Sequence, residues 1–363
     1  MRSGEESFRA GRVLVTGAGG FLGANLVWAL REHGFRVRAL VRRPPRGPQW
    51  QGVSDVEFVL GDICNAPLVA RALDGVTGVL HAAALTRVVP RPRRDAFRVN
   101  VEGTRIMCAA ALKAGVRRFV FTSSISTLAP GTAENPATED SPINREPIYA
   151  PYYDSKRRAE QVVRDFATWG LETITFCPGY LLGPRDARPT TNEILLYAAR
   201  WRWPILPPGG MSVLDVREAA LAHVRALWLG KPGERYGLAG PYRSYADLGR
   251  IVRRILGCGG VHVMPHWARF AGSVPLAILA GVWPDGPNGL MVPSFQYGFI
   301  PYHLSGVKAD ETFSLTHRPP EETVFDALRW FRDTGLVSWL PGRRKLVPVH
   351  FVATPQAENA AKK

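Results

Sequence analysis

A glycine-rich turn directly after a short apolar strand constrains the fold more than any other feature of this sequence. The strand pattern covers residues 12–16, and the turn is the heptad Gly-Ala-Gly-Gly-Phe-Leu-Gly at 17–23. Apolar residues then recur near helical spacing until Gly34, a residue type that commonly ends a helix. A strand, a tight turn and a helix in this order predict the first unit of an α/β sheet.

The alternation of strands and helices continues for about 170 residues. Strands that alternate with helices form parallel sheets, because each crossover returns the chain to the same end of the sheet. We therefore predict an α/β fold with a doubly wound parallel sheet of the Rossmann type. The further predicted strands are 35–41, 56–60, 78–81, 118–122 and 172–176, and the main helices are 95–114 and 152–169.

The three glycines of the turn suit the binding of a dinucleotide. One must turn the chain tightly, one must let a pyrophosphate approach bare backbone, and one must let the helix pack close to the sheet. Gly17, Gly20 and Gly23 have the spacing for these roles. The helix N-terminus, with Phe21 and Leu22 in its first turn, would then hold the anionic pyrophosphate. An ordinary strand–helix turn is the alternative.

The end of the second predicted strand bears on the choice between NAD and NADP. An acidic side chain there would accept hydrogen bonds from the ribose hydroxyls and repel a 2′-phosphate. This chain instead places Arg42 and Arg43 after Val41. A guanidinium binds phosphate oxygens bidentately, so we predict a preference for NADP(H) over NAD(H), with Arg42 as the first candidate and Arg43 as the second. Either arginine can instead be an ordinary surface residue.

A hydroxyl, a phenol and an ammonium follow in an order that suits proton transfer to a carbonyl. Tyr152 and Lys156 are four residues apart on one predicted helix, so they share a face. Free tyrosine has a pKa near 10, and we expect the lysine ammonium to lower it. Ser124, after the fifth predicted strand, would hydrogen-bond the reacting carbonyl. The competing hydroxyl groups belong to Thr122, Ser123, Tyr149 and Tyr153.

These fragments, taken together, resemble the extended short-chain dehydrogenase/reductase family, which includes the NAD-dependent epimerases and dehydratases. The glycine spacing, the Thr-Ser-Ser segment at 122–124, the Tyr-x-x-x-Lys pair and the Pro-Gly pair at 178–179 carry the resemblance. It covers roughly residues 10–337 and is weakest at 262–306.

Later segments are similar to one branch of that family. This branch holds the dihydroflavonol-reductase-like and hopanoid-associated sugar-epimerase-like proteins, near the 3β-hydroxysteroid dehydrogenases. The segments that carry this likeness are 188–191, 213–218, 233–240 and 318–322.

The resemblance implies roles for individual residues. Ser124 would polarise the carbonyl, Tyr152 would donate the proton in the reductive direction, and Lys156 would also hold the nicotinamide ribose. Asp62 is expected at the adenine amino group, and Asn100 is expected to support the active site. Besides the turn and the arginines, the implied cofactor-binding residues are Asp62, Ile63, Ala82, Ala83, Ala84, Asn100, Thr122, Lys156, Pro178 and Gly179.

The resemblance also implies a division of the chain. Residues 10–180 would form the cofactor-binding core, to which 212–230 would return. Residues 181–211 and 231–340 would form a smaller, mostly C-terminal substrate-binding region. Residues 341–363 read as a basic flexible tail.

Two enzymatic functions and one other function fit these residues. The first is an NADP(H)-dependent oxidoreductase that interconverts a ketone and a secondary alcohol on a hydrophobic lipid-, steroid- or polyketide-like substrate. The second is a nucleotide-sugar epimerase or dehydratase. Dehydratases of the family carry Asp-Glu where this chain has Ser123-Ser124, which argues against a dehydratase. Epimerases usually hold NAD, so Arg42 argues against an epimerase. The arginines from Arg87 to Arg98 could nevertheless hold the diphosphate of a nucleotide sugar. The third is a cofactor-sensing protein without catalysis.

The net charge of +15 could indicate nucleic-acid binding. The basic residues are dispersed, however, and no nucleic-acid motif accompanies them, so we expect no such partner. We also expect no metal site, because the four cysteines are widely spaced. We expect a cytoplasmic protein, because no apolar leader precedes the first strand. A homodimer is left open.

Residues 267–283 form the most apolar run of the chain, with tryptophan at both ends. The run is shorter than the roughly 20 residues that a membrane span needs. One interpretation is a buried helix or a lid over the substrate pocket. The other is a helix in the interface of an anionic membrane, which would place the protein peripherally at the inner membrane face.

Overall fold

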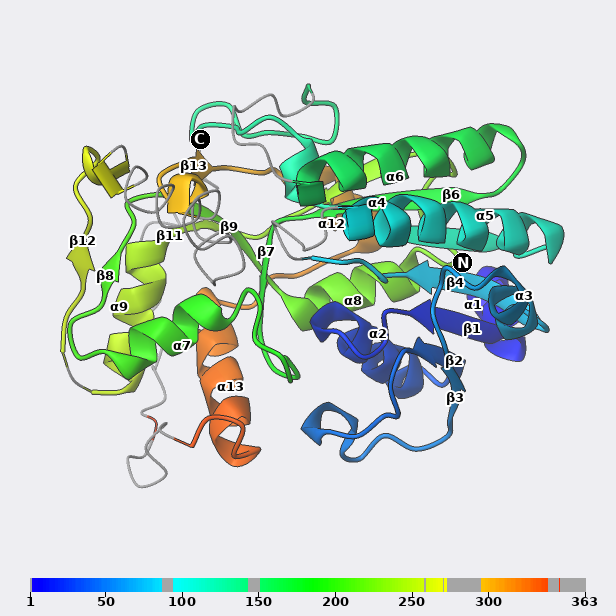
Figure 1. Ribbon diagram of the computed structural model, residues 1–363, viewed down its shortest axis with the longest axis horizontal. Coiled ribbons are helices and arrows are strands. Elements are labelled where there is room, and N and C mark those ends of the chain that lie inside the picture. Colours follow the sequence, from blue (N-terminus) through cyan, green and yellow to red (C-terminus); the bar gives the residue numbers. More distant parts are fainter. Residues whose placement is uncertain are drawn as a thin grey trace.

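A computed structural model of the protein describes residues 2–86, 94–142, 151–257, 259–269, 271–272, 295–338 and 346. Its largest element is a seven-stranded sheet with the order β10-β6-β5-β4-β1-β2-β3, in which every pair is parallel (Figure 1). The predicted fold class is therefore confirmed. The strands are β1 (Arg12–Thr16), β2 (Arg36–Val41), β3 (Val56–Leu60), β4 (Val76–His81), β5 (Arg118–Thr122), β6 (Thr173–Pro178) and β10 (Arg235–Leu238).

Helices cover both faces of this sheet. On one face α2 packs against α8, and on the other α5 packs against α3 and α6 (Figure 1). Strand β1 shows why both faces must be covered: Val13 and Val15 belong to the first core and Leu14 to the second, and all three are fully buried. The helices are α1 (Arg2–Ala10), α2 (Phe21–Glu32), α3 (Ala66–Ala72), α4 (Arg94–Phe97), α5 (Gly103–Lys113), α6 (Pro151–Thr168), α8 (Val216–Arg225) and α12 (Val307–Phe313).

The strand order reverses direction between β1 and β4. At such a point the loops after the two strands diverge to opposite faces and leave a crevice at the carboxyl ends of the strands, where ligands bind in open α/β sheets. Three short helical turns border the sheet: η1 (Pro48–Trp50), the π-helix η2 (Arg98–Glu102) and η3 (Ile125–Thr127).

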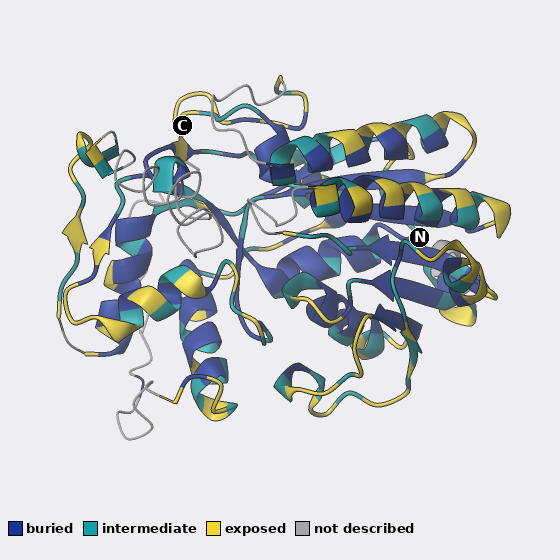
Figure 2. Cartoon of the chain, viewed as in Figure 1, coloured by how far each residue is buried: buried dark blue, intermediate teal, exposed yellow. Residues whose placement is uncertain are grey.

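A smaller region lies beyond β6. Its four-stranded sheet contains β7 (Tyr180–Leu182), β9 (Gly210–Asp215), β11 (Tyr242–Ser244) and β13 (Pro301–Tyr302). Three helices share a separate core beside it: α7 (Glu193–Arg200), α9 (Tyr245–Ile255) and α13 (Pro320–Asp333). A two-stranded sheet pairs β8 (Ile205–Leu206) with β12 (His262–Val263). Figure 2 shows that burial is densest in the strands and on the inner faces of the helices.

The chain returns to the large sheet more than once. Helix α8, inside 212–230, packs on α2, and β10 and α12, inside 231–340, add a strand and a helix to the large core. The substrate-binding role of 181–211 and 231–340 stays a prediction. The predicted tail 341–363 lies outside the described residues except for Leu346, which is buried against the α7, α9 and α13 core.

Among the described residues, no helix combines the length and the apolarity that crossing a bilayer requires. Of the apolar run at 267–283, the structure describes only residues 267–269, 271 and 272. The arginine cluster at 87–93 and Tyr149 also lie outside the described residues.

The turn between β1 and α2 yields a prediction about stability. A Cβ at Gly23 would overlap the carbonyl oxygen of Gly17, whereas a Cβ at Gly19 would have no heavy atom within 4 Å. Gly23→Ala should therefore lower the free energy of unfolding by about 1–3 kcal/mol despite the better helix propensity of alanine. Gly19→Ala, the matched control, should change it by less than about 0.5 kcal/mol. Urea unfolding of both variants tests this, and equal stability would contradict the close packing at Gly23.

Candidate functional site

The glycine turn presents bare backbone at the start of α2. Gly17 has a φ of 66°, and a Cβ there would lie 2.6 Å from the backbone nitrogen of Ala83, so only glycine fits this contact between two loops. Gly19 and Gly20 are exposed, and no side chain caps the helix that begins at Phe21. The unpaired N–H groups of a first helical turn attract anions. The turn therefore fits the pyrophosphate of a dinucleotide.

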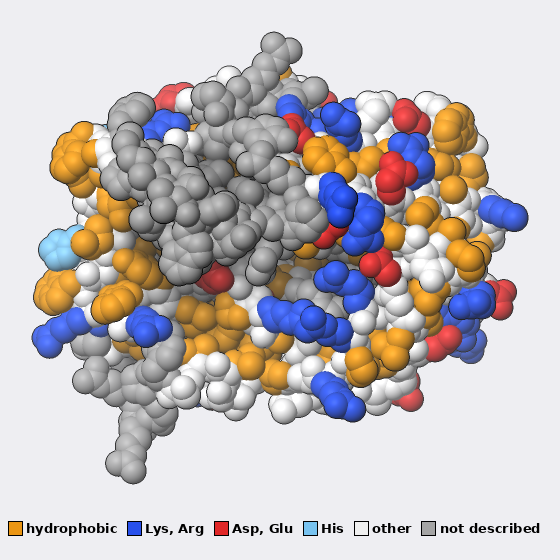
Figure 3. Space-filling model, in the orientation of Figure 1, with side chains coloured by type: hydrophobic (Ala, Val, Ile, Leu, Met, Phe, Trp, Pro, Cys, Tyr) orange, Lys and Arg blue, Asp and Glu red, His pale blue; other side chains and the backbone are white. Residues whose placement is uncertain are grey.

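Strand β2 brings two arginines beside this turn. Leu40 pairs with Thr16, so the residues that follow β2 emerge next to the loop that follows β1. Arg42 and Arg43 are exposed, and neither makes a hydrogen bond or an ion pair with another described residue. The basic side chains of the displayed face lie in several separate groups rather than in one continuous patch (Figure 3).

The loop after β3 holds Asp62 in place. Its Oδ1 accepts a hydrogen bond of 2.9 Å from the backbone nitrogen of Cys64, and its Oδ2 lies 3.9 Å from a guanidinium nitrogen of Arg98. Ile63, the next residue, is buried. The adenine contact expected for Asp62 stays a prediction, and part of its hydrogen-bonding capacity serves its own loop.

His81, at the end of β4, is the buried centre of a hydrogen-bond chain. Thr104 donates to the carbonyl oxygen of Asn100 (2.7 Å), so its oxygen must accept the bond of 3.0 Å from His81 Nε2–H. His81 Nδ1 then accepts from the hydroxyl of Thr16 (2.8 Å), whose oxygen in turn accepts from the backbone nitrogen of Ala83 (3.2 Å). Burial lowers the pKa of His81 to about 3, so the ring is neutral.

Asn100 connects the loop after β4 to helix α6. Its side chain accepts from the backbone nitrogen of Leu85 (2.7 Å) and donates to the hydroxyl of Ser155 (2.9 Å). Ser155 donates in turn to the carbonyl oxygen of Tyr152 (2.7 Å). Asn100 belongs to the π-helix η2, a distortion that is frequent at functional sites. The geometry supports the structural role that the sequence resemblance implied.

Ser124 and Tyr152 meet at the carboxyl end of β5. Ser124 Oγ accepts two bonds from Ser126, one from its backbone nitrogen (3.2 Å) and one from its hydroxyl (2.9 Å). Its own hydrogen is therefore available to the phenol of Tyr152, and the Ser124 hydroxyl lowers the pKa of that phenol. Removal from water has the larger effect and raises this pKa above that of free tyrosine.

The expectation that Lys156 lowers the pKa of Tyr152 is not met in this structure. The lysine ammonium instead donates to the carbonyl oxygen of Thr122 (2.6 Å) and lies 4.5 Å from the centre of the Phe121 ring. Burial lowers the pKa of Lys156 to about 8, and the carboxylate of Glu160 counteracts part of this shift. Lys156 therefore keeps most of its charge at neutral pH.

Glu160 is a site residue that the sequence analysis missed. It lies one turn after Lys156 and is 4% exposed. Its Oε1 accepts from the hydroxyls of Ser123 and Thr127, and its Oε2 lies 3.5 Å from a guanidinium nitrogen of Arg235. Glu160 thus ties the end of β5 and η3 to α6 and β10. Its spacing of four residues from Lys156 is the signal that could have identified it.

His223 is another residue that the sequence analysis missed, and it holds the hydroxyl of Thr122. The Oγ1 of Thr122 bonds to His223 Nε2 (2.9 Å). His223 Nδ1–H donates to the carbonyl of Ala219 (2.7 Å), so Thr122 must be the donor in that bond. Gly179 follows β6 and lets the chain pass close to β9, because a Cβ there would be 2.5 Å from the carbonyl oxygen of Ser212. Nothing local in the sequence identifies the partner of Thr122, because His223 belongs to the returning helix α8.

Aromatic rings border the phenol of Tyr152. The ring of Tyr153 lies 5.6 Å from that of Tyr152 and 4.9 Å from that of Tyr297. Tyr297 and Ile300 are buried and pack with Tyr153 in a small apolar cluster. Burial raises the pKa of Tyr153, which keeps its phenol neutral.

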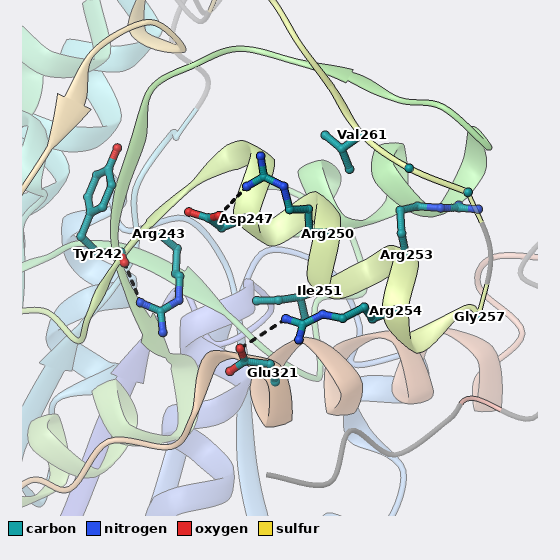
Figure 4. Close-up of a pocket in the computed structure, with 12 residues that line it drawn as sticks. Tyr242, Arg243, Asp247, Arg250, Ile251, Arg253, Arg254, Gly257, Val261 and Glu321 are labelled. Atoms are coloured by element: carbon teal, nitrogen blue, oxygen red, sulfur yellow. Dashed lines mark hydrogen bonds and ion pairs between the residues drawn. The ribbon is translucent and has the colours of Figure 1, made fainter. Parts of the chain in front are cut away.

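A hollow of 820 Å³ lies elsewhere, on the smaller region (Figure 4). It contains none of the residues that the sequence predicted for the site. Its arginines are engaged: Arg250 bonds Asp247 (2.6 Å) and Arg254 lies 3.6 Å from Glu321. This hollow is therefore separate from the predicted site at Ser124 and Tyr152.

Comparisons with known proteins agree with the geometry. Residues 13–238 match the model of the NAD dependent epimerase/dehydratase family. Sterol demethylase protein B of Methylococcus capsulatus is 32% identical over 89% of this chain and 99% of its own length. Ceramide reductase of Caulobacter vibrioides is 34% identical over 58% of this chain and 59% of its own length.

A solved structure extends the likeness to the fold. The crystal structure of a nucleoside-diphosphate-sugar epimerase from Pseudomonas aeruginosa has a TM-score of 0.71 at 25% identity, covering 90% of this chain and 98% of that chain. The family match spans the glycine turn, the Ser124–Tyr152 pair and β10. The chain therefore belongs to the NAD-dependent epimerase/dehydratase family of extended short-chain dehydrogenases/reductases, as its sequence resemblance predicts.

Proposed function

We propose that the protein is an NADP(H)-dependent oxidoreductase that interconverts a ketone and a secondary alcohol on a hydrophobic substrate. One observation carries this proposal: the hydroxyl of Ser124 at the end of β5 acts on the phenol of Tyr152, and Lys156 lies one helical turn further along α6 and bonds the carbonyl of Thr122 at the same strand end. This arrangement supplies a hydrogen-bond donor, a proton donor and a buried cation at the carboxyl edge of the sheet.

The residues at the crevice fit a dinucleotide. The exposed turn at Gly19 and Gly20 and the uncapped start of α2 would hold the pyrophosphate, and Arg42 would bind the 2′-phosphate. Bound there, the cofactor supplies or accepts the hydride. The guanidinium groups of Arg42 and Arg43 are exposed and have no partner among the described residues, which supports NADP(H) over NAD(H).

The chain's own residues handle the proton. Ser124 donates a hydrogen bond to the oxygen of the reacting carbonyl or of Tyr152, because its own oxygen is already used by Ser126. Tyr152 stays protonated at neutral pH, because burial raises its pKa, and it is therefore suited to donate a proton to the developing alkoxide. The ammonium of Lys156, which bonds the carbonyl oxygen of Thr122, keeps a positive charge at the same end of β5. This assignment favours reduction of the ketone.

A hydrophobic substrate is supported by two observations. The cluster of Tyr153, Tyr297 and Ile300 places apolar surface next to the proton donor. Two relatives of this chain carry names that refer to a sterol and to ceramide. A nucleotide-sugar epimerase is the second candidate, and the likeness to the epimerase structure favours it. An epimerase would retain its cofactor without net redox change, so the cofactor that co-purifies with the protein separates the two functions.

Tyr152→Phe tests the proton donor. We expect turnover in NADPH-dependent reduction of sterol-type and ceramide-type ketones to fall by a factor on the order of 10²–10⁴, with NADPH affinity retained. Tyr153→Phe is the matched control, because Tyr153 has no lysine four residues further along the helix. This substitution should leave turnover largely unchanged. Turnover of Tyr152→Phe near that of the wild type would remove this residue from the mechanism.

Arg42→Ala tests the cofactor preference. Calorimetric titration should show a much larger loss of affinity for NADPH than for NADH, because only NADPH carries the 2′-phosphate. Arg46→Ala removes an exposed arginine of the same loop and serves as the control. Equal losses for both cofactors would refute the phosphate contact.

Glu160→Gln tests the electrostatic support of Lys156. The negative charge of Glu160 raises the pKa of Lys156, so its removal should lower that pKa from about 8. The alkaline decline of the reduction rate should then begin at lower pH, and competitive acylation of Lys156 should report the same shift.

Two companion variants separate this effect from a loss of structure. Glu160→Asp keeps the charge and should restore the profile, and Glu172→Gln removes an exposed carboxylate that pairs with Arg118 and should not move it. An unchanged pH profile in a folded Glu160→Gln protein would show that Glu160 has only a structural role.

A further inference from the structure

The edge of the molecule that carries β8 and β12 lies at the left of Figure 1 and includes residues that Figure 2 colours as exposed, several of which are large and apolar. Each of them keeps between 45% and 69% of its surface exposed. They come from two segments that the pairing of β8 with β12 brings together. We call this surface the aromatic edge, and its residues are Trp201, Trp203, Ile205, Val263 and Trp267.

The backbone beneath the aromatic edge is held firmly. Arg253 is 6% exposed, and its guanidinium donates to the carbonyl oxygens of Ala198 (3.2 Å), Ala199 (3.4 Å) and Trp201 (3.0 Å). It therefore caps the C-terminal end of α7 from within. The backbone that carries the exposed rings is therefore already ordered, which reduces the entropy lost when they bind a partner.

Backbone hydrogen bonds hold the second segment to the first. The nitrogen of His262 donates to Pro204 (3.0 Å), and the nitrogen of Met264 donates to Leu206 (2.8 Å). The ring of Trp203 also lies 5.6 Å from that of His262. The two segments therefore form one continuous surface.

The charged side chains within the two segments of the aromatic edge are all basic. Residues 194–206 and 259–269 contain no aspartate or glutamate, but they contain Arg200, Arg202 and Arg269. The adjoining hollow is lined by Gly259, Gly260 and Val261 of the second segment and by four arginines against two acidic residues (Figure 4). An anionic partner would be attracted to this side of the molecule.

We propose that the aromatic edge docks the protein on the surface of an anionic lipid bilayer. Tryptophan favours the boundary between headgroups and acyl chains, and nearby arginines add attraction to anionic lipid. A second copy of the chain fits less well. A twofold contact through this edge would place Arg200 and Arg202 of the two copies near one another, where like charges repel. The surface includes only Trp267 from the apolar run at 267–283, and the other four side chains come from outside that run.

Flotation with lipid vesicles tests the apolar contribution. The purified protein should float with vesicles of phosphatidylcholine and phosphatidylglycerol, more strongly at low salt, and much less with phosphatidylcholine alone. The double variant Trp201→Ala/Trp267→Ala should lose partitioning by a factor on the order of tenfold or more. Trp169→Ala is the matched control, because Trp169 is 61% exposed but follows the far end of α6.

A charge reversal tests the electrostatic contribution. Arg202→Glu should weaken partitioning to anionic vesicles by about fivefold or more, since one basic residue near a membrane surface contributes about that factor. Arg71→Glu makes the same charge change on the exposed surface of α3 and should have a clearly smaller effect. Circular dichroism melting of each variant confirms that it is folded.

Three outcomes would overturn the proposal. The first is a wild-type protein that stays unbound with anionic vesicles at both salt concentrations. The second is an equal loss of partitioning in the Trp169→Ala control. The third is a dimer, detected by light scattering, that dissociates in the Trp201→Ala/Trp267→Ala variant, which would identify a second copy as the occupant. None of these outcomes depends on the proposed reaction, because no measurement uses turnover.

Discussion

The buried hydrogen-bond chain through His81 is the constraint on which the site depends. It runs from the backbone of Ala83 through Thr16 to His81, and from there through Thr104 to Asn100. Each donor in this hydrogen-bond chain finds an acceptor only while the imidazole of His81 is neutral. Burial keeps the ring neutral by lowering the pKa of His81 to about 3. Because Asn100 then bonds Ser155 on α6, the glycine turn and the proton donor are held by one network.

The fold was predictable where local pattern and tertiary environment agree. Strands of a sheet that helices cover on both faces are short apolar runs, so the sequence predicted β1 and β5 with the bounds that the structure has. Strand β10 was not predicted as part of this sheet. Its sequence Arg-Tyr-Gly-Leu has no apolar run, and its place is set by pairing with β6 across many intervening residues. The spacing of apolar residues in the predicted helix 95–114 also does not reveal the π-helix inside it.

The sequence could predict which residues of the candidate site share a helix face, but not how deeply they are buried or which groups they bond. Helical spacing correctly placed Tyr152 and Lys156 on one helix, and the same spacing extends to Glu160. The pKa of Tyr152 was predicted with the wrong sign, because a spacing of four residues shows proximity but not burial. The ammonium of Lys156 bonds a backbone carbonyl, a partner that no side-chain pattern reveals.

The excess of basic residues has a structural explanation in several places. Arg225 donates to the carbonyl oxygens of Phe313 (2.5 Å) and Ser314 (2.7 Å), and Arg253 caps α7 in the same way. Such arginines donate hydrogen bonds to neutral carbonyl groups at the C-terminal ends of helices. Each therefore adds to the net charge of +15 without pairing with an acidic residue. High positive charge therefore does not by itself indicate a polyanion site here, and only exposed arginines such as Arg42 and Arg202 bear on binding.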